Sequence, residues 1–251
     1  MIYILFILFT LAILLFVLYQ IQFFLVFEPK KHRREVLDER FTPLEIKTED
    51  DIFLEGIEYA PKEFSHTVFY LGGKSQDSVA LIHKLAHHFE NFRIVTFNYR
   101  GYGESGGTVS EEKLYADALE VAQKFALRYG SFSIVGYSLG SSLAAYIASK
   151  VTIEKLVLIG AFDSVKTLFK QRGFPSFLIK YHFDTYLHVR EVNAPVYLLA
   201  SKDDTIVPLQ NVYNLKENIK NLAEYKELSS YNHDEILLCE ESIEFIKRVL
   251  V

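Results

Sequence analysis

Hydrophobic and polar residues divide the 251-residue chain into two unequal parts. From Met1 through Phe27 there is no charged side chain, whereas from Leu44 onward short apolar runs alternate with amphipathic stretches. The short runs are rich in Val, Ile, Leu, Phe and Tyr, as expected of strands that are buried on both faces. These runs are TVFYL, RIVTFN, FSIVG, KLVLIG and PVYLLA.

The stretches between the apolar runs have helical spacing. In EEKLYADALEVAQKFALRYG one helical face carries five apolar residues, and Gly130 is placed to cap the C-terminus. Further helices are predicted over 78–89, 141–149, 209–219 and 240–250, and extended segments over 44–48 and 52–59 predict an antiparallel edge pair. This alternation predicts an α/β fold, a mainly parallel sheet with helices on both faces. Ligands of such sheets bind beyond the carboxyl ends of the strands.

The uncharged N-terminal run exceeds the roughly 20 apolar residues that a membrane-spanning helix needs. A cleaved signal peptide is one alternative, but it would have a basic start, a shorter apolar region and small residues at the cleavage site. A buried core helix is another, although uniform hydrophobicity of this length is rare in soluble domains. We therefore predict a transmembrane anchor at 1–27, a basic juxtamembrane linker at 28–43 and a catalytic domain at 44–251.

Four basic residues follow the apolar run directly: Lys30, Lys31, Arg33 and Arg34. Lys and Arg beside a membrane span tend to remain in the cytoplasm, which predicts a single-pass protein with a cytoplasmic catalytic domain. The same cluster could bind anionic lipid headgroups of the bilayer. A plain hydrophilic stop after an apolar helix predicts the same side.

Composition argues against two classes of protein. The formal net charge is −5, so general nucleic-acid binding is not expected. Cys239 is the only cysteine, which excludes an intrachain disulfide framework and a zinc–cysteine cluster. The sequence does not predict an oligomeric state.

The candidate chemistry starts at Ser138, in the segment SIVGYSLGSS. Gly136-Tyr137-Ser138-Leu139-Gly140 follows a predicted strand and precedes a predicted helix, which is the setting of the G-x-S-x-G nucleophile elbow. The flanking glycines relieve crowding around a strained serine, and the backbone N–H of Leu139 would face a developing oxyanion. A purely structural turn of small residues is the alternative.

A nucleophilic serine needs a histidine base and an acid that orients this base. Among the eight histidines, His233 follows the last strand-like run and precedes the final helix, so it is placed at the carboxyl edge of the sheet. Asp203 and Asp204 end another strand at that edge, and the order serine, aspartate, histidine is the order of this architecture. Position along the chain does not choose between the two aspartates, and either could be a turn residue.

With these segments assembled, the chain resembles the α/β-hydrolase superfamily. More narrowly, it resembles membrane-anchored bacterial hydrolases that are grouped with serine-aminopeptidase-like and monoglyceride-lipase-like members. The resemblance runs from about Leu44 to the C-terminus and implies an inner-membrane location. The acid loop of the family commonly reads G-x-x-D-x-hydrophobic-V-P, and SKDDTIVP aligned with it selects Asp204, with Ser201 in place of glycine.

Two further loops resemble the family. In FYLGGKSQD, Gly72 and Gly73 take the places of the usual His-Gly, which makes the backbone N–H of Lys74 the second oxyanion donor. An exposed turn lysine is the alternative reading of Lys74. NYRGYGESGG resembles a loop that usually begins Asp-Tyr-Arg-Gly; Asn98 replaces the aspartate, and we expect a structural role for it, with Arg100 pinning the loop.

The resemblance implies a serine hydrolase that acts on esters or thioesters of lipid-like or acylated substrates and requires no metal or organic cofactor. Residues 161–195, where the family inserts lids, are short, which predicts a minimal lid. Four phenylalanines there are candidates either for an acyl pocket or for core packing: Phe162, Phe169, Phe174 and Phe177. A serine peptidase, or an inactive membrane-tethered binding protein with the same fold, remains an alternative.

Overall fold

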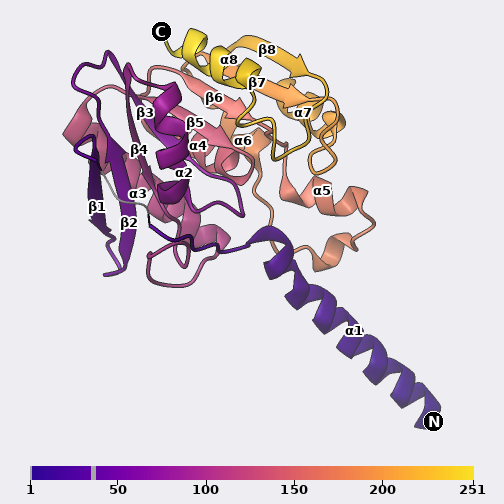
Figure 1. Ribbon diagram of the computed structural model, residues 1–251. Coiled ribbons are helices and arrows are strands. Elements are labelled where there is room, and N and C mark those ends of the chain that lie inside the picture. Colours follow the sequence, from indigo (N-terminus) through magenta and orange to yellow (C-terminus); the bar gives the residue numbers. More distant parts are fainter. Residues whose placement is uncertain (1, 35–37) are drawn as a thin grey trace.

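The computed structural model describes residues 2–34 and 38–251. It shows an eight-stranded sheet with helices on both faces and one long helix that projects away from the domain (Figure 1). The spatial order of the strands is β1-β2-β4-β3-β5-β6-β7-β8. The β1–β2 and β2–β4 pairs are antiparallel and the remaining pairs are parallel, so the predicted mainly parallel sheet is confirmed.

The central strands are mostly apolar because helices cover both of their faces. Every residue of β5 and β6 is buried. The strands are β1 Phe41–Lys47, β2 Phe53–Tyr59, β3 His66–Leu71, β4 Phe92–Phe97, β5 Ser133–Tyr137, β6 Leu156–Ile159, β7 Val196–Ser201 and β8 Leu222–Leu228.

Two separate hydrophobic cores flank the sheet. Helices α2 and α8 contribute to one core, and α3, α4, α6 and α7 contribute to the other. The helices are α1 Ile2–Val26, α2 Ser78–Leu85, α3 Glu111–Tyr129, α4 Leu139–Lys150, α5 Val165–Gln171, α6 Thr185–Val189, α7 Leu209–Lys216 and α8 Glu240–Leu250, with 3-10 turns η1 Ala86–His88 and η2 Ser176–Leu178. The predicted helix over 78–89 is thus an α-helix that continues as a 3-10 turn.

The antiparallel edge pair β1–β2 is present as predicted, but it begins earlier. Strand β1 starts at Phe41, inside the segment that was predicted as a linker. Pro43 is compatible with this strand because β1 is at the edge of the sheet and needs no donor on its outer side. Residues 35–37 of the predicted linker lie outside the described residues.

Helix α1 is long and apolar enough to cross a membrane, with a mean hydropathy of 2.9 in its most apolar window. None of the residues in that window is buried, which excludes the core-helix alternative for this part of the helix. Its last turn differs, because Gln22, Val26 and the adjoining Phe27 are buried in the domain. The segment predicted as a minimal lid, residues 161–195, contains α5, η2 and α6, and η2 contacts the end of α1 (Figure 1).

Candidate active site

Ser138 connects the end of β5 to the start of α4 with an unusual backbone conformation. Its φ is 52° and its ψ is −119°, a region that L-residues rarely adopt. The turn is possible only because its neighbours are small. A Cβ at Gly136 would lie 2.6 Å from the Ala144 Cβ, and a Cβ at Gly140 would lie 2.1 Å from the carbonyl oxygen of Leu71. Both glycines of the motif are therefore required by close approach of the elbow to its surroundings.

His233 lies in the loop between β8 and α8 and reaches the serine directly. Its Nε2 is 2.7 Å from the Ser138 Oγ, and only 6% of the histidine is exposed. Tyr137, the last residue of β5, holds this loop in place: its hydroxyl donates a 2.7 Å hydrogen bond to the carbonyl oxygen of His233. At Gly160, a Cβ would lie 3.2 Å from the Cε1 of the imidazole, so a glycine there leaves room for the ring.

Asp204 completes a chain of hydrogen bonds behind the histidine. Its Oδ2 is 2.6 Å from the Nδ1 of His233, and its Oδ1 accepts 2.8 Å hydrogen bonds from the backbone N–H groups of Ile206 and Val207. Asp203 points elsewhere and accepts a 2.6 Å hydrogen bond from the backbone N–H of Ser230. The structure thus brings Ser138, His233 and Asp204 together, and it leaves Asp203 outside this arrangement.

These contacts determine the tautomer of the imidazole. The carboxylate of Asp204 can only accept, so the proton of a neutral His233 belongs on Nδ1. The Nε2 is then free to accept the Ser138 hydroxyl proton. This is the arrangement that a general base needs in order to activate a serine.

The two backbone donors predicted from the sequence border the same cavity as the serine. Lys74, Ser138 and Leu139 all line a cavity of about 90 Å³ at the carboxyl edge of the sheet. Leu139 is the first residue of α4, where a backbone N–H has no partner within the helix. Neither this N–H nor that of Lys74 has an acceptor among residues 2–34 and 38–251, so both are available to a ligand.

The loop that carries Lys74 is held by side chains that the sequence analysis missed. The Tyr99 hydroxyl donates to the carbonyl of Gly72 at 2.7 Å, and the Tyr102 hydroxyl donates to the carbonyl of Lys74 at 2.6 Å. Burial raises the pKa of both phenols above the ordinary tyrosine range, which keeps them protonated as donors. Both tyrosines lie in the NYRGYG stretch. Its position at the start of a glycine-rich loop was the sequence signal that could have identified them.

Asn98 and Arg100 are structural, as expected. Arg100 is 4% exposed and forms ion pairs with Asp50 and with the buried Asp117, each at 2.6 Å. The Asn98 amide nitrogen donates to Asp77 at 2.7 Å, next to the start of α2. Burial opposes ionisation of Asp77, but hydrogen bonds that it accepts, chiefly from the Arg34 side chain, outweigh this and lower its pKa.

The walls of the cavity beside Ser138 are mostly apolar. Two of the four candidate phenylalanines, Phe162 and Phe169, line it. Phe174 packs on the ring of Phe169 at 5.3 Å between centroids, whereas Phe177 is 78% exposed. The cavity is lined by Leu25, Val26, Lys74, Ser138, Leu139, Phe162, Val165, Leu168, Phe169, Arg172, Ile206 and Val207.

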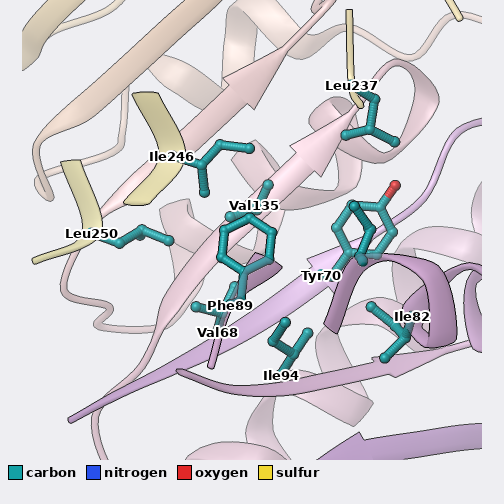
Figure 2. Close-up of a pocket in the computed structure, with 10 residues that line it drawn as sticks. Val68, Tyr70, Ile82, Phe89, Ile94, Val135, Leu237, Ile246 and Leu250 are labelled. Atoms are coloured by element: carbon teal, nitrogen blue, oxygen red, sulfur yellow. The ribbon is translucent and has the colours of Figure 1, made fainter. Parts of the chain in front are cut away.

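A second apolar cavity, of about 30 Å³, lies on the opposite face of the sheet between α2 and α8 (Figure 2). Figure 2 shows side chains from both helices and from the strands pointing into it, among them Ile82, Val135 and Ile246. Its one polar group is the hydroxyl of Tyr70, which already donates to the Gln76 side chain at 2.7 Å. We assign this cavity to the core, because its lining is otherwise apolar and its one hydroxyl is already hydrogen-bonded.

Comparisons with known proteins agree with this architecture. Residues 70–190 match the sequence profile of the alpha/beta hydrolase fold family. The esterase PF2001 of Pyrococcus furiosus superimposes with a TM-score of 0.71 at 19% identity, covering 90% of this chain and 96% of that chain. An esterase domain from a Rhodothermus marinus protein superimposes with a TM-score of 0.64 at 15% identity, covering 84% and 96%. The chain therefore has the α/β-hydrolase fold.

Among proteins of known function, the lysophosphatidylserine lipase ABHD12 of Danio rerio is 29% identical over 162 residues. The alignment covers 54% of this chain and 42% of that protein, so the chain spans less than half the length of this relative.

Proposed function

We propose that the chain is a membrane-anchored serine hydrolase that cleaves carboxylic ester or thioester bonds of lipid-like or acylated substrates. The observation that carries the proposal is the continuous relay from the Ser138 hydroxyl through the His233 imidazole to the Asp204 carboxylate, with contacts of 2.7 and 2.6 Å. The apolar cavity beside the serine and the lipase and esterase relatives support an acyl ester as substrate.

In the acylation step, His233 Nε2 takes the proton from Ser138 Oγ while this oxygen forms a bond to the substrate carbonyl carbon. The carbonyl oxygen becomes an oxyanion, which the backbone N–H groups of Lys74 and Leu139 stabilise. One such donor contributes roughly 2.7–4 kcal/mol to the lowering of the barrier. The tetrahedral intermediate then expels the alkoxide or thiolate, which receives the proton from Nε2.

In the deacylation step, water enters the same position as the leaving group. His233 Nε2 removes a proton from this water as its oxygen attacks the acyl carbon, and the collapsing intermediate returns the proton to Ser138 Oγ. Asp204 remains ionised throughout and stabilises the imidazolium that forms twice in each cycle.

Helix α1 supports the membrane part of the proposal. It is apolar, 25 residues long and exposed over its N-terminal part, as expected of a helix that is surrounded by lipid. The basic residues after it are less free than the sequence suggests. Lys31 pairs with Glu104 at 2.9 Å, and Arg34 pairs with Glu55 and with Asp77. The proposed cytoplasmic location of the domain is therefore supported by the number of Lys and Arg residues near the span, and not by unpaired charges.

Fluorophosphonate labelling of the full-length protein tests the chemistry. The parent protein should be labelled and should hydrolyse p-nitrophenyl esters, whereas Ser138→Ala should lose both properties. Ser149→Ala is the matched control, since its hydroxyl lies further along α4 and bonds only to the Tyr146 carbonyl. Hydrolysis by Ser138→Ala, or a folded parent that is not labelled, would contradict the proposal and would favour a binding protein.

A reporter fused to the C-terminus tests the orientation. Activity of a reporter that works only outside the cytoplasm would overturn the proposed cytoplasmic domain. Recovery of the chain in the soluble fraction, after cleavage behind the apolar run, would instead identify α1 as a signal peptide.

A further inference from the structure

Helix α1 consists of two parts with different surroundings. Residues 2–21 are exposed or half-buried and carry no buried side chain, whereas Gln22, Val26 and Phe27 are buried against the domain. Gln22 and Val26 are four residues apart and lie on one helical face, and Phe27 follows directly after the helix. Val26 and Phe27 belong to the same hydrophobic core as the elbow residue Leu139. The end of α1 is therefore part of the folded domain.

A buried polar residue fixes the orientation of this docked part. Gln22 is fully buried, its Nε2 donates to the carbonyl of Leu178 and its Oε1 accepts from the N–H of Lys180, both at 2.8 Å. Buried amides that lose such partners are costly, so this two-point contact favours one docking arrangement over others of similar hydrophobicity. It joins α1 to the small lid segment around η2.

The docked turn also contacts the loop that carries the proposed oxyanion donor. The Lys74 side chain donates to the carbonyl of Leu25 at 3.1 Å, one of the last carbonyls of α1, and the N–H of Glu28 donates back to the Lys74 carbonyl at 3.1 Å. A positive group at the C-terminus of a helix is stabilised by the helix dipole. The end of α1 thus holds the Lys74 side chain, and the residue that follows Phe27 holds the Lys74 carbonyl.

The same turn lines the cavity of the serine. Leu25 and Val26 border the cavity that contains Ser138, and Leu168 and Phe169 of α5 line it as well. Leu25 is 44% exposed, so its side chain reaches from the cavity to the outer surface. An acyl chain attached to Ser138 would therefore lie against α1.

The length of the exposed part of α1, residues 2–21, indicates that this cavity lies beside the membrane. Twenty residues at about 1.5 Å each span about 30 Å, the thickness of a bilayer hydrocarbon core. At the end of this span, the Tyr19 ring lies 5.3 Å from the Lys180 ammonium, and both residue types prefer the membrane–water interface. Leu25 follows Tyr19 by about 9 Å along the helix.

We propose that the last turn of α1 is a wall of the substrate site, and that Leu25 determines which acyl chain lengths are accepted from the adjoining bilayer. This inference rests on the proposed function. In it, the apolar helix has a second role besides tethering, because an acyl chain that leaves the lipid phase would follow α1 to the serine.

The test compares the full-length parent with Leu25→Trp and Leu25→Ala in detergent micelles. The measured quantity is kcat/KM for a series of p-nitrophenyl esters from butyrate to palmitate, expressed as the ratio of long-chain to short-chain activity. Leu25→Trp should lower this ratio at least tenfold, and Leu25→Ala should move the optimum to longer chains. Leu14→Trp is the matched control on the exposed part of the helix and should leave the ratio unchanged.

A second pair of variants tests the docking contact. Gln22→Leu removes the bonds to the lid, and Gln20→Leu makes the same chemical change two residues earlier, where the side chain is exposed. Only Gln22→Leu should lower the ratio, while membrane retention stays unchanged in both variants.

The outcomes separate this inference from the proposed function. A parent that hydrolyses no ester would refute the proposed function itself. A parent that hydrolyses esters, with a ratio that is unchanged in Leu25→Trp or that changes equally in Leu14→Trp, would overturn the role of Leu25 alone. Equal losses on short and long esters would also overturn it, since a wall of the acyl site acts on chain length.

Discussion

Replacing Asp204 with asparagine changes one charge at nearly constant volume, and the structure determines how the new amide must orient. The Oδ1 accepts 2.8 Å hydrogen bonds from the N–H groups of Ile206 and Val207. An NH₂ group there would face two donors, so the amide oxygen must stay in this position. The NH₂ group must then face the Nδ1 of His233, 2.6 Å from Oδ2. Nδ1 has to become an acceptor, which moves the proton to Nε2, where it faces Ser138 Oγ.

An imidazole with its proton on Nε2 cannot accept the serine proton. In serine hydrolases with this relay, such a tautomer change lowers kcat about 10⁴-fold. This factor corresponds to about 5.4 kcal/mol in the activation barrier. The free energy of unfolding should change far less, by about 1–2 kcal/mol, because two hydrogen bonds to a charged acceptor become hydrogen bonds to a neutral one. The predicted variant is therefore folded but inactive.

The assay is steady-state ester hydrolysis, combined with denaturant unfolding of the same samples. Asp203→Asn is the matched control, because its carboxylate bonds the Ser230 N–H and does not contact the imidazole. It should retain most of the parental kcat. Parental turnover in Asp204→Asn, or a larger loss in Asp203→Asn, would refute the assignment of the acid.

Four further variants test the packing and the ion pairs of the domain. Gly140→Ala would place a Cβ 2.1 Å from the last carbonyl oxygen of β3, so the unfolding free energy should fall by about 1–3 kcal/mol together with turnover; unchanged denaturant midpoints would contradict this. Arg100→Met leaves the buried Asp117 without its partner and should cost about 3–5 kcal/mol of stability. Arg40→Met, in an exposed ion pair, should cost far less stability than Arg100→Met, and equal losses in the two variants would refute the argument. Because the pKa of Asp77 is lowered in the folded protein, its charge contributes stability above the unfolded carboxyl pKa, and this contribution is lost as the pH falls through the folded pKa. The stability difference between the parent and Asp77→Asn should therefore narrow between pH 7 and pH 3 in urea titrations, and a constant difference would argue against the lowered pKa.

The fold and the elbow were predictable because their signals are local. Continuous apolar runs mark strands that helices cover on both faces, and two glycines around Ser138 mark a turn that larger residues would block. His233 was accessible from chain order. The choice between Asp203 and Asp204 was not, since neighbouring side chains point in different directions and only the family pattern gave the register.

The docking of α1 was not predictable from hydropathy. The run from Met1 to Phe27 is uniformly apolar, so nothing in it distinguishes a lipid-facing residue from one that packs on protein. Gln22 reads as a tolerated polar residue until its partners near η2 are known. The early start of β1 at Phe41 was also missed. Pro43 separates Phe41 from the apolar residues that predicted the strand.

The positive φ of Ser138 lowers the stability of the fold at the residue that the proposed activity requires. Holding a non-glycine residue in such a conformation costs roughly 1–3 kcal/mol, whereas the extra backbone entropy of a glycine costs about 0.5–1 kcal/mol. Among inactive replacements, Ser138→Gly should therefore resist denaturant better than Ser138→Ala, and the reverse order would show that the turn is unstrained. A chain under no selection for hydrolysis would gain stability by replacing this serine with glycine, so the strain at residue 138 is a stability cost of the proposed chemistry.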